Sequence, residues 1–239
     1  MRVIVAEKHI NLPKRYRKQG VVEIQKSIAV ACSAIGLALC GNGLGAYAAE
    51  TQPGNSGRTF AHWCRTRASL NPEAKHTVEV LLKKAGTTEC DAANQTLLSL
   101  TGLLLPNNQI SDLKPLESLT NLTVLFLPNN QISDIKPLES LTNLNLLYLD
   151  KNQISDIKPL ESLTNLTVLD LDNNQISDIK PLESLTNLNL LYLDNNRISD
   201  IKPLQSLTNL ILLRLSGNPI APKTCPLKSE FMCKWEPRN

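Results

Sequence analysis

The feature that most constrains this chain is a sequence unit of about 22 residues that recurs six times between residues 97 and 220. The second copy reads LTNLTVLFLPNNQISDIKPLES, and the copies after the first begin at Leu119, Leu141, Leu163, Leu185 and Leu207. A unit of this size cannot bury its own leucines, so successive copies must stack and cover one another. The period therefore predicts a solenoid. Such a fold presents an extended surface to a binding partner rather than a pocket to a substrate.

Within each copy, leucines alternate with variable residues in the segment LxLxxN, which is the period of a short, half-buried strand. Leu125 and Leu127 are expected to point into the core, and the residues between them to point the other way. Stacked copies would then form a parallel β-sheet. The amide of the following asparagine can donate and accept hydrogen bonds. We interpret the six asparagines as a ladder between adjacent loops, rather than as a ligand site: Asn108, Asn130, Asn152, Asn174, Asn196 and Asn218.

The segment ISDIKPLESL returns the chain on the opposite side. Proline fits the first position of a helical turn, and the glutamate after it lies near the positive end of the turn's dipole. Lysine would hold the cap position, where it is a poor choice. We therefore expect one short 3-10 turn per repeat on a convex side, and we interpret the columns that contain Asp112, Lys114 and Glu117 as a solvated face.

An apolar stretch from Ile28 to Cys40 is about 13 residues long, which is too short to span a bilayer. Basic residues precede it and small residues follow it, which is the layout of a secretory signal peptide cleaved near Ala48 or Ala49. We expect residues 1–48 to be this signal, residues 49–58 a linker, and the protein to be secreted, periplasmic or in the cell envelope. A lipoprotein anchor at Cys40 is the alternative.

The positive charge of the chain comes from this leader. Residues 1–48 hold seven Lys/Arg and two Asp/Glu, so removing their net +5 takes the chain from +3 to −2. A nucleic-acid-binding domain would need a basic surface. We therefore expect no nucleic-acid partner, and no membrane span.

The four remaining cysteines flank the repeats: Cys64 and Cys90 precede them, and Cys225 and Cys233 follow. Solenoid ends expose core leucines and need caps, so a cysteine pair at each end of an exported chain favours one disulfide per cap. The alternative, a zinc site, is disfavoured because the pairs lie far apart in sequence. We assign residues 59–96 to a helical N-terminal cap, residues 97–220 to the repeats and residues 221–239 to a C-terminal cap.

Two helices are expected near the N-terminal cap. Asn71-Pro72 should begin the first, and Gly86 should end it. The second should cover residues 92–98.

The pattern LxxLxxLxLxxNxIxxIxxL, from Leu119 to Leu138, resembles the short leucine-rich repeats of bacterial internalin-like proteins and of eukaryotic phosphatase regulators. With its leader and caps, the chain resembles secreted bacterial leucine-rich-repeat proteins over about half of its length. The resemblance implies an α/β solenoid: a leucine-rich-repeat superhelix with a short parallel concave sheet and a convex side of 3-10 turns. It also implies a non-enzymatic protein-binding role for the concave sheet.

The strand residues that point away from the core align in three columns across the repeats. The first is an apolar ridge, expected to be exposed, and such ridges usually mark interaction sites. The second contains aromatic residues, which dominate interface hot spots, and the third adds carboxylates. We expect a protein partner to bind this face through Val124, Phe126, Leu146, Tyr148, Asp150, Asp170, Asp172, Leu190, Tyr192, Asp194 and Arg214. The alternative is a structural or envelope-associated solenoid whose duplicated repeats have no specific partner on this face.

The sequence contains no readable catalytic constellation. Cys64 lies two residues from His62, but its expected disulfide removes it as a nucleophile. The acidic patch of Asp150, Asp170, Asp172 and Asp194 could hold calcium, but side chains spread along rigid strands rarely converge on one ion. We expect a monomer without enzymatic activity, cofactor or metal.

The leader interpretation predicts that the protein isolated from its host begins near Ala49 or Glu50. Intact-mass spectrometry of the native protein measures this directly. A mature protein that keeps residues 1–48 in the membrane would overturn the export hypothesis.

Overall fold

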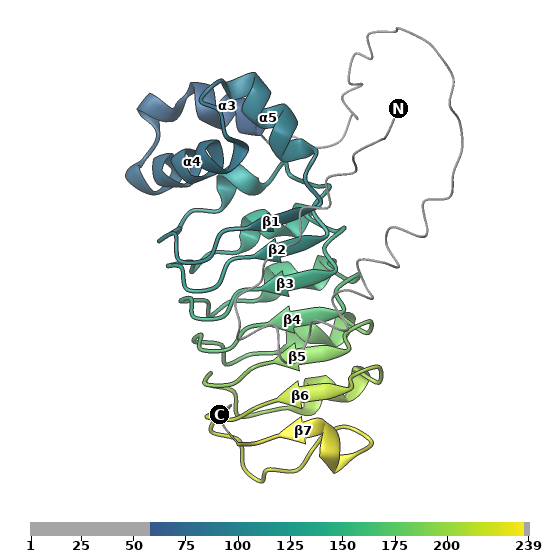
Figure 1. Cartoon of the computed structure of the whole chain (residues 1–239). Coiled ribbons are helices and arrows are strands. Elements are labelled where there is room, and N and C mark those ends of the chain that lie inside the picture. Colours follow the sequence, from purple (N-terminus) through teal and green to yellow (C-terminus); the bar gives the residue numbers. More distant parts are fainter. Residues whose placement is uncertain (1–57, 237–239) are drawn as a thin grey trace, which may run out of the picture. The chain divides into compact units, whose positions relative to one another are not determined.

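The computed structural model describes residues 58–236, so the expected signal peptide and nearly all of the linker lie outside the described residues. Seven strands form one parallel sheet in the order in which they occur along the chain (Figure 1). Their bounds are β1 Gly102–Leu104, β2 Val124–Phe126, β3 Leu146–Tyr148, β4 Val168–Asp170, β5 Leu190–Tyr192, β6 Leu212–Arg214 and β7 Cys233–Lys234. This confirms the predicted parallel sheet.

One 3-10 turn returns the chain behind each of the strands β1 to β5, as predicted. These turns are η2 Lys114–Leu116, η3 Lys136–Ser140, η4 Lys158–Ser162, η5 Lys180–Ser184 and η6 Lys202–Ser206. The prediction that lysine holds the cap position is wrong, because lysine is the first residue of each turn. The aspartate two residues earlier supplies the missing acceptor: Asp156 Oδ1 accepts from the Lys158 N–H group at 2.9 Å. The aspartate column is therefore a structural part of each turn as well as a polar surface.

A continuous hydrophobic core runs from the N-terminal cap through all repeats to the C-terminal cap. Each repeat contributes its inward leucines, and the second to the fifth repeats each add two isoleucines. In the second repeat, Leu125, Leu127, Ile132 and Ile135 are buried in this way. The inward leucines of neighbouring strands lie in direct register, as Leu125 does with Leu147, so each repeat covers the next.

The asparagine ladder is confirmed, and it joins every pair of adjacent repeats. Asn152 Nδ2 donates to the carbonyl oxygen of Leu127 in the preceding repeat at 3.1 Å, and to that of Leu149 in its own repeat at 2.9 Å. Its Oδ1 accepts from the N–H group of Ile132 at 3.0 Å. Because these atoms are buried, the amide provides the hydrogen bonds that water cannot reach.

The residue before each ladder asparagine adopts a left-handed backbone conformation. Asparagine tolerates this conformation and occupies most of these positions, but Lys151 has φ 57°. Gly217 takes the last position with φ 73°, where a Cβ atom would lie 2.2 Å from Asn195 Oδ1. Glycine adopts this conformation without steric cost and leaves that space to the Asn195 side chain.

Three helices cover the first end of the core: α3 Phe60–Arg65, α4 Pro72–Ala85 and α5 Cys90–Leu98. Helix α4 begins and ends as predicted, because the Asn71 side chain accepts from the Ala74 N–H group at 2.8 Å and Gly86 is left-handed. Helix α5 begins two residues earlier than predicted, and α3 was not predicted. Thr77 attaches α4 to the first repeat by donating to the Asp112 carbonyl oxygen at 2.7 Å.

Each cap contains the expected disulfide. Cys64 pairs with Cys90 between α3 and α5, and Cys225 pairs with Cys233 at the far end. Cys64 is therefore not a free thiol, which excludes the nucleophile considered above. The C-terminal cap also contains β7, which the sequence did not predict; it extends the sheet by pairing with β6.

No helix between residues 58 and 236 is long and apolar enough to cross a membrane.

The ladder predicts that Asn152→Ala lowers the free energy of unfolding by about 1–3 kcal/mol, because it leaves buried backbone groups without partners. Urea denaturation followed by circular dichroism measures the loss.

Asn143→Ala is the matched control. Asn143 is exposed and donates one bond, to the Thr120 carbonyl oxygen at 2.9 Å. Water can replace that bond, so the change should stay within about 0.5 kcal/mol. Equal effects of the two substitutions would contradict a special role for the ladder.

Candidate partner-binding face of the sheet

The strand residues opposite the leucine core form one surface, here called the sheet face, that runs across β1 to β6. Backbone register places equivalent residues beside one another: Val124 pairs with Leu146, and Phe126 with Tyr148. The same alignment continues through Asp170 and Tyr192 to the last repeat. The structure therefore brings the predicted candidate residues into the columns that strand parity predicted.

The first column differs from the exposed ridge that we predicted. Val124, Leu146 and Val168 are buried, and Leu190 is partly buried. Neighbouring strands lie only about 4.8 Å apart, so side chains in one column cover one another. The prediction that this column is exposed is wrong for its first members.

Aromatic residues occupy the second column at three positions. The rings of Phe126 and Tyr148 lie in contact, with centroids 5.2 Å apart and planes tilted by 53°. Asp170 separates Tyr148 from Tyr192 in the same column. The side chains on this face are not isolated, since each of the following has an interaction partner: Phe126, Tyr148, Asp150, Asp170, Asp172 and Tyr192.

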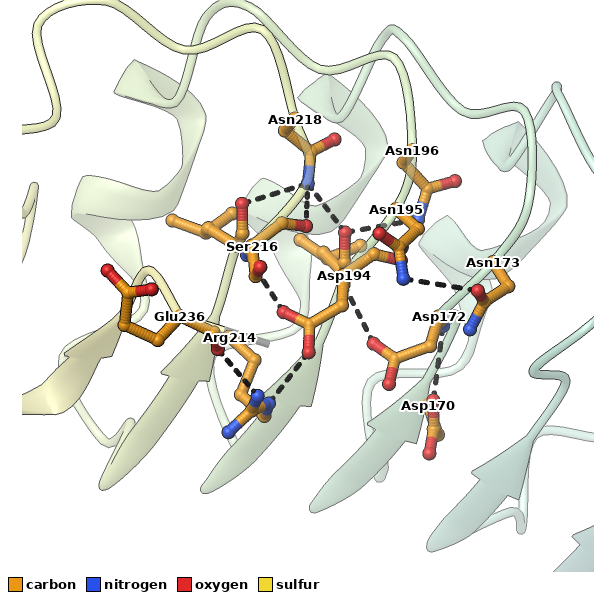
Figure 2. Close-up of polar contacts among 12 residues, drawn as sticks. Asp170, Asp172, Asn173, Asp194, Asn195, Asn196, Arg214, Ser216, Asn218 and Glu236 are labelled. Carbon is orange, nitrogen blue, oxygen red and sulfur yellow. Dashed lines mark hydrogen bonds and ion pairs between the residues drawn. The ribbon is translucent and has the colours of Figure 1, made fainter. Parts of the chain in front are cut away.

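The carboxylates of the sheet face bond to the backbone of neighbouring loops (Figure 2). Asp172 Oδ1 accepts from the Asp194 N–H group at 2.7 Å, one repeat further on. Asp194 Oδ1 repeats this bond to the Ser216 N–H group at 2.8 Å. Asp170 Oδ1 accepts from the Asp172 N–H group at 3.1 Å. Two predicted binding residues, Asp172 and Asp194, thus also hold adjacent repeats together, whereas the Asp170 bond lies within its own repeat.

Arg214 closes the column at the C-terminal end. Its Nε donates to Asp194 Oδ2 at 2.8 Å, and its Nη2 donates to the Glu236 carbonyl oxygen at 2.9 Å (Figure 2). Both side chains of the ion pair are largely buried. The pair therefore links the last repeats to the C-terminal cap.

The polar edge beside the third column was not predicted as part of the site. Asn129 Nδ2 donates to Asn107 Oδ1 at 2.6 Å, and Asn195 Nδ2 donates to Asn173 Oδ1 at 3.1 Å. Lys151, which is exposed, interrupts this row. In the sequence, this polar edge could have been recognised from the residue before each ladder asparagine, which is itself an asparagine in most repeats.

The calcium alternative gains no support from the geometry. Among residues 58–236, no group of three or more His, Cys, Asp or Glu side chains is placed to hold a metal ion.

The Arg214–Asp194 ion pair predicts that Asp194→Ala lowers the free energy of unfolding by about 3 kcal/mol, because it leaves a largely buried guanidinium without its carboxylate. Chemical denaturation measures this. Asp194→Asn keeps an acceptor for the Ser216 N–H group and should lose less. If Asp194→Ala leaves the free energy of unfolding unchanged, the carboxylate does not stabilise the fold.

The comparisons with known proteins agree with this architecture. A family model described as leucine-rich repeats (two copies) matches residues 98–140 and 142–184. No curated protein sequence matches the chain.

Three solved structures are similar to it. An internalin from Listeria monocytogenes is 42% identical, with a TM-score of 0.52, over 54% of this chain and 38% of its own. A leucine-rich-repeat protein from Leptospira interrogans is 34% identical, with a TM-score of 0.51, over 55% of this chain and 35% of its own. Internalin C2 from Listeria monocytogenes is 32% identical, with a TM-score of 0.49, over 71% of this chain and 96% of its own.

This chain therefore spans less than two fifths of the length of the first and second of these proteins. The repeat model, the ladder and the parallel sheet agree on one assignment. The chain is a leucine-rich-repeat protein whose repeats are of the internalin-like type.

Proposed function

We propose that the protein is an exported, non-enzymatic binding module that holds a protein partner along its concave sheet face. The observation that carries this proposal is the location of the sequence differences between two nearly identical repeats. The repeats that begin at Leu119 and Leu163 share 20 of 22 residues, and the two differences are Phe126 against Asp170 and Pro128 against Asp172. Both differences lie on the sheet face.

The inward leucines and isoleucines, the ladder asparagines and the turn residues are the same in these two repeats, so the differences are confined to the sheet face. Phe126 and Asp170 occupy the same column, with Tyr148 between them. The chain thus varies its chemistry on one face while it keeps the scaffold constant. A repeat scaffold used for recognition varies in this way, because binding specificity is set by the side chains of the face.

Export is supported by the two disulfides. Both caps are cross-linked, and such bonds persist in oxidising compartments outside the cytosol.

The alternative is a structural or envelope-associated solenoid without a specific partner. It is favoured by the backbone bonds of Asp172 and Asp194, because these carboxylates already have a role in holding repeats together. Substitutions of the aromatic residues of the second column separate the two functions experimentally.

The proposal predicts that the double variant Tyr148→Ala, Tyr192→Ala loses its partner while it keeps its fold. Each truncation should cost about 1–2 kcal/mol of binding free energy if the tyrosines are hot spots. Pull-down from an envelope extract with wild type and variant identifies the partner, and calorimetry with that partner measures the loss.

Two further variants make this experiment decisive. Phe126→Asp with Pro128→Asp turns the second repeat into a copy of the fourth, so the fold should tolerate it while the face changes. Lys158→Ala alters an exposed residue of η4, behind the sheet, and should leave binding unchanged. If the folded tyrosine variant recovers the same partners as wild type with equal affinity, the aromatic column is not the site.

A further inference from the structure

The disulfide of the N-terminal cap lies against a cation that the sheet-face proposal does not use. Arg67 begins a short 3-10 turn, η1 Arg67–Ser69, just after helix α3. Its Nη1 lies 3.3 Å from Cys64 Sγ and 3.4 Å from Cys90 Sγ, and it donates to the Cys64 carbonyl oxygen at 3.0 Å. One nitrogen of the guanidinium therefore contacts both sulfurs of the bond.

A guanidinium in this position favours the reduced form of the bond. The disulfide carries no net charge, so the cation attracts it only weakly. A thiolate at either cysteine would instead place a full negative charge beside Arg67. A neighbouring cation stabilises a thiolate, and stabilisation of the reduced form makes a disulfide easier to reduce.

The position of Cys90 also favours a thiolate. Cys90 is the first residue of α5, a helix of nine residues, and the N-terminus of a helix stabilises negative charge. Cys90 is partly exposed, whereas Cys64 is completely buried. A thiol reagent can therefore reach Cys90 Sγ, and Cys64 is then the sulfur that leaves.

The carboxylates that flank Cys90 in the sequence offset little of this stabilisation. Asp91 forms an ion pair with Arg65, which partly neutralises its charge. Glu89 is exposed, so water and salt screen its charge.

The disulfide of the C-terminal cap has neighbours of the opposite sign. Cys225 Sγ lies 3.4 Å from the Ser229 carbonyl oxygen, which is the negative end of a peptide dipole. The Cys225 N–H group donates to the Glu230 carboxylate at 3.4 Å, so a negative charge also lies close to this cysteine. These neighbours disfavour a thiolate, and the C-terminal bond should therefore resist reduction better than the N-terminal one.

We propose that the Cys64–Cys90 bond is a redox-sensitive link in the N-terminal cap, and that Arg67 holds the thiolate that forms on Cys64 when the bond opens. One thiolate of a dithiol reductant attacks Cys90 Sγ. The bond between the two protein sulfurs breaks, and its electron pair leaves on Cys64.

The second thiolate of the reductant completes the exchange. It attacks the reductant sulfur of the mixed disulfide, so that Cys90 leaves as a thiolate and the reductant becomes a disulfide. The protein gains two electrons, and the two protons that the reductant gave up pass through solvent to the two cysteines. The reaction is thiol–disulfide exchange, which runs in either direction.

Opening this bond changes what holds the first end of the core. The bond links α3 to α5, and α3 supplies Phe60 to the core. After reduction, the Arg65–Asp91 ion pair and the hydrogen bond from the Ala61 N–H group to Asn94 Oδ1, at 3.2 Å, still join the two helices. The cap therefore loosens rather than detaches, and its stability follows the redox state of its surroundings.

The test measures the equilibrium of each disulfide of the purified protein with reduced and oxidised dithiothreitol. Acid quenching, alkylation and peptide mass spectrometry read the two bonds separately in one sample. In wild type, the N-terminal bond should open at a lower ratio of reduced to oxidised reagent than the C-terminal bond. Arg67→Gln should make the N-terminal bond about tenfold harder to reduce, which is about 30 mV for this two-electron couple, and should leave the C-terminal bond unchanged.

The sign of the change distinguishes this proposal from a purely structural role of Arg67. If Arg67 only stabilises the folded cap through the Cys64 carbonyl oxygen, then Arg67→Gln weakens the cap and makes the bond easier to reduce. Arg67→Lys keeps the charge and should be reduced more readily than Arg67→Gln. Arg65→Gln is the matched control, because it removes a cation of the same helix pair that bonds to Asp91 rather than to sulfur. It should change the equilibrium by less than about twofold, as expected for an exposed ion pair.

Circular dichroism of the oxidised variants checks that they are folded. Unchanged or easier reduction of folded Arg67→Gln, or an equal effect of Arg65→Gln, would overturn the proposal. Wild type in which the C-terminal bond opens first would also overturn it, and that measurement needs no variant.

Discussion

The amide of the ladder asparagine is the interaction on which the rest of the structure depends. A repeat of about 22 residues must turn its backbone sharply after each three-residue strand, and the turn leaves carbonyl and N–H groups inside the stack. Asn152 satisfies three of these groups at once, in its own repeat and in the preceding one. A side chain without both a donor and an acceptor could not do so. The ladder therefore fixes the period and the distance between repeats.

Fixing the period has a consequence for the sheet face. Because every strand is held in the same register, equivalent side chains form columns on the face opposite the inward leucines. This is why Phe126 and Asp170 can stand at equivalent positions in two otherwise near-identical repeats. The core and the sheet face are encoded by alternate residues of the same three-residue strand.

The sequence predicted the features that depend on local chemistry or on the repeat itself. The ladder, the parallel strands, the boundaries of α4 and both disulfides follow from spacing and residue type. The features it missed depend on neighbours that periodicity does not describe. Strand β7 forms only because β6 offers it a free edge. The first column is more buried than parity implies, because burial depends on adjacent strands. One miss was local: Asp156 accepts from the N–H group two residues on, an Asx turn that the repeated aspartate before each lysine could have indicated.

The last repeat shows how the array ends without losing these constraints. Position 214 lies in the aromatic column, but its arginine bonds to Asp194 and to the Glu236 carbonyl oxygen instead of presenting a ring. Position 217 holds glycine, which keeps the left-handed turn while the Asn195 side chain occupies the space that a Cβ atom would take. Position 211 loses the polar residue of its column. The first two changes join the array to its cap, whereas the third removes a polar bond and exposes an apolar side chain. At the C-terminal end, residues 214 and 217 therefore complete the fold, whereas the exposed side chain of Ile211 adds an apolar surface that the fold does not need.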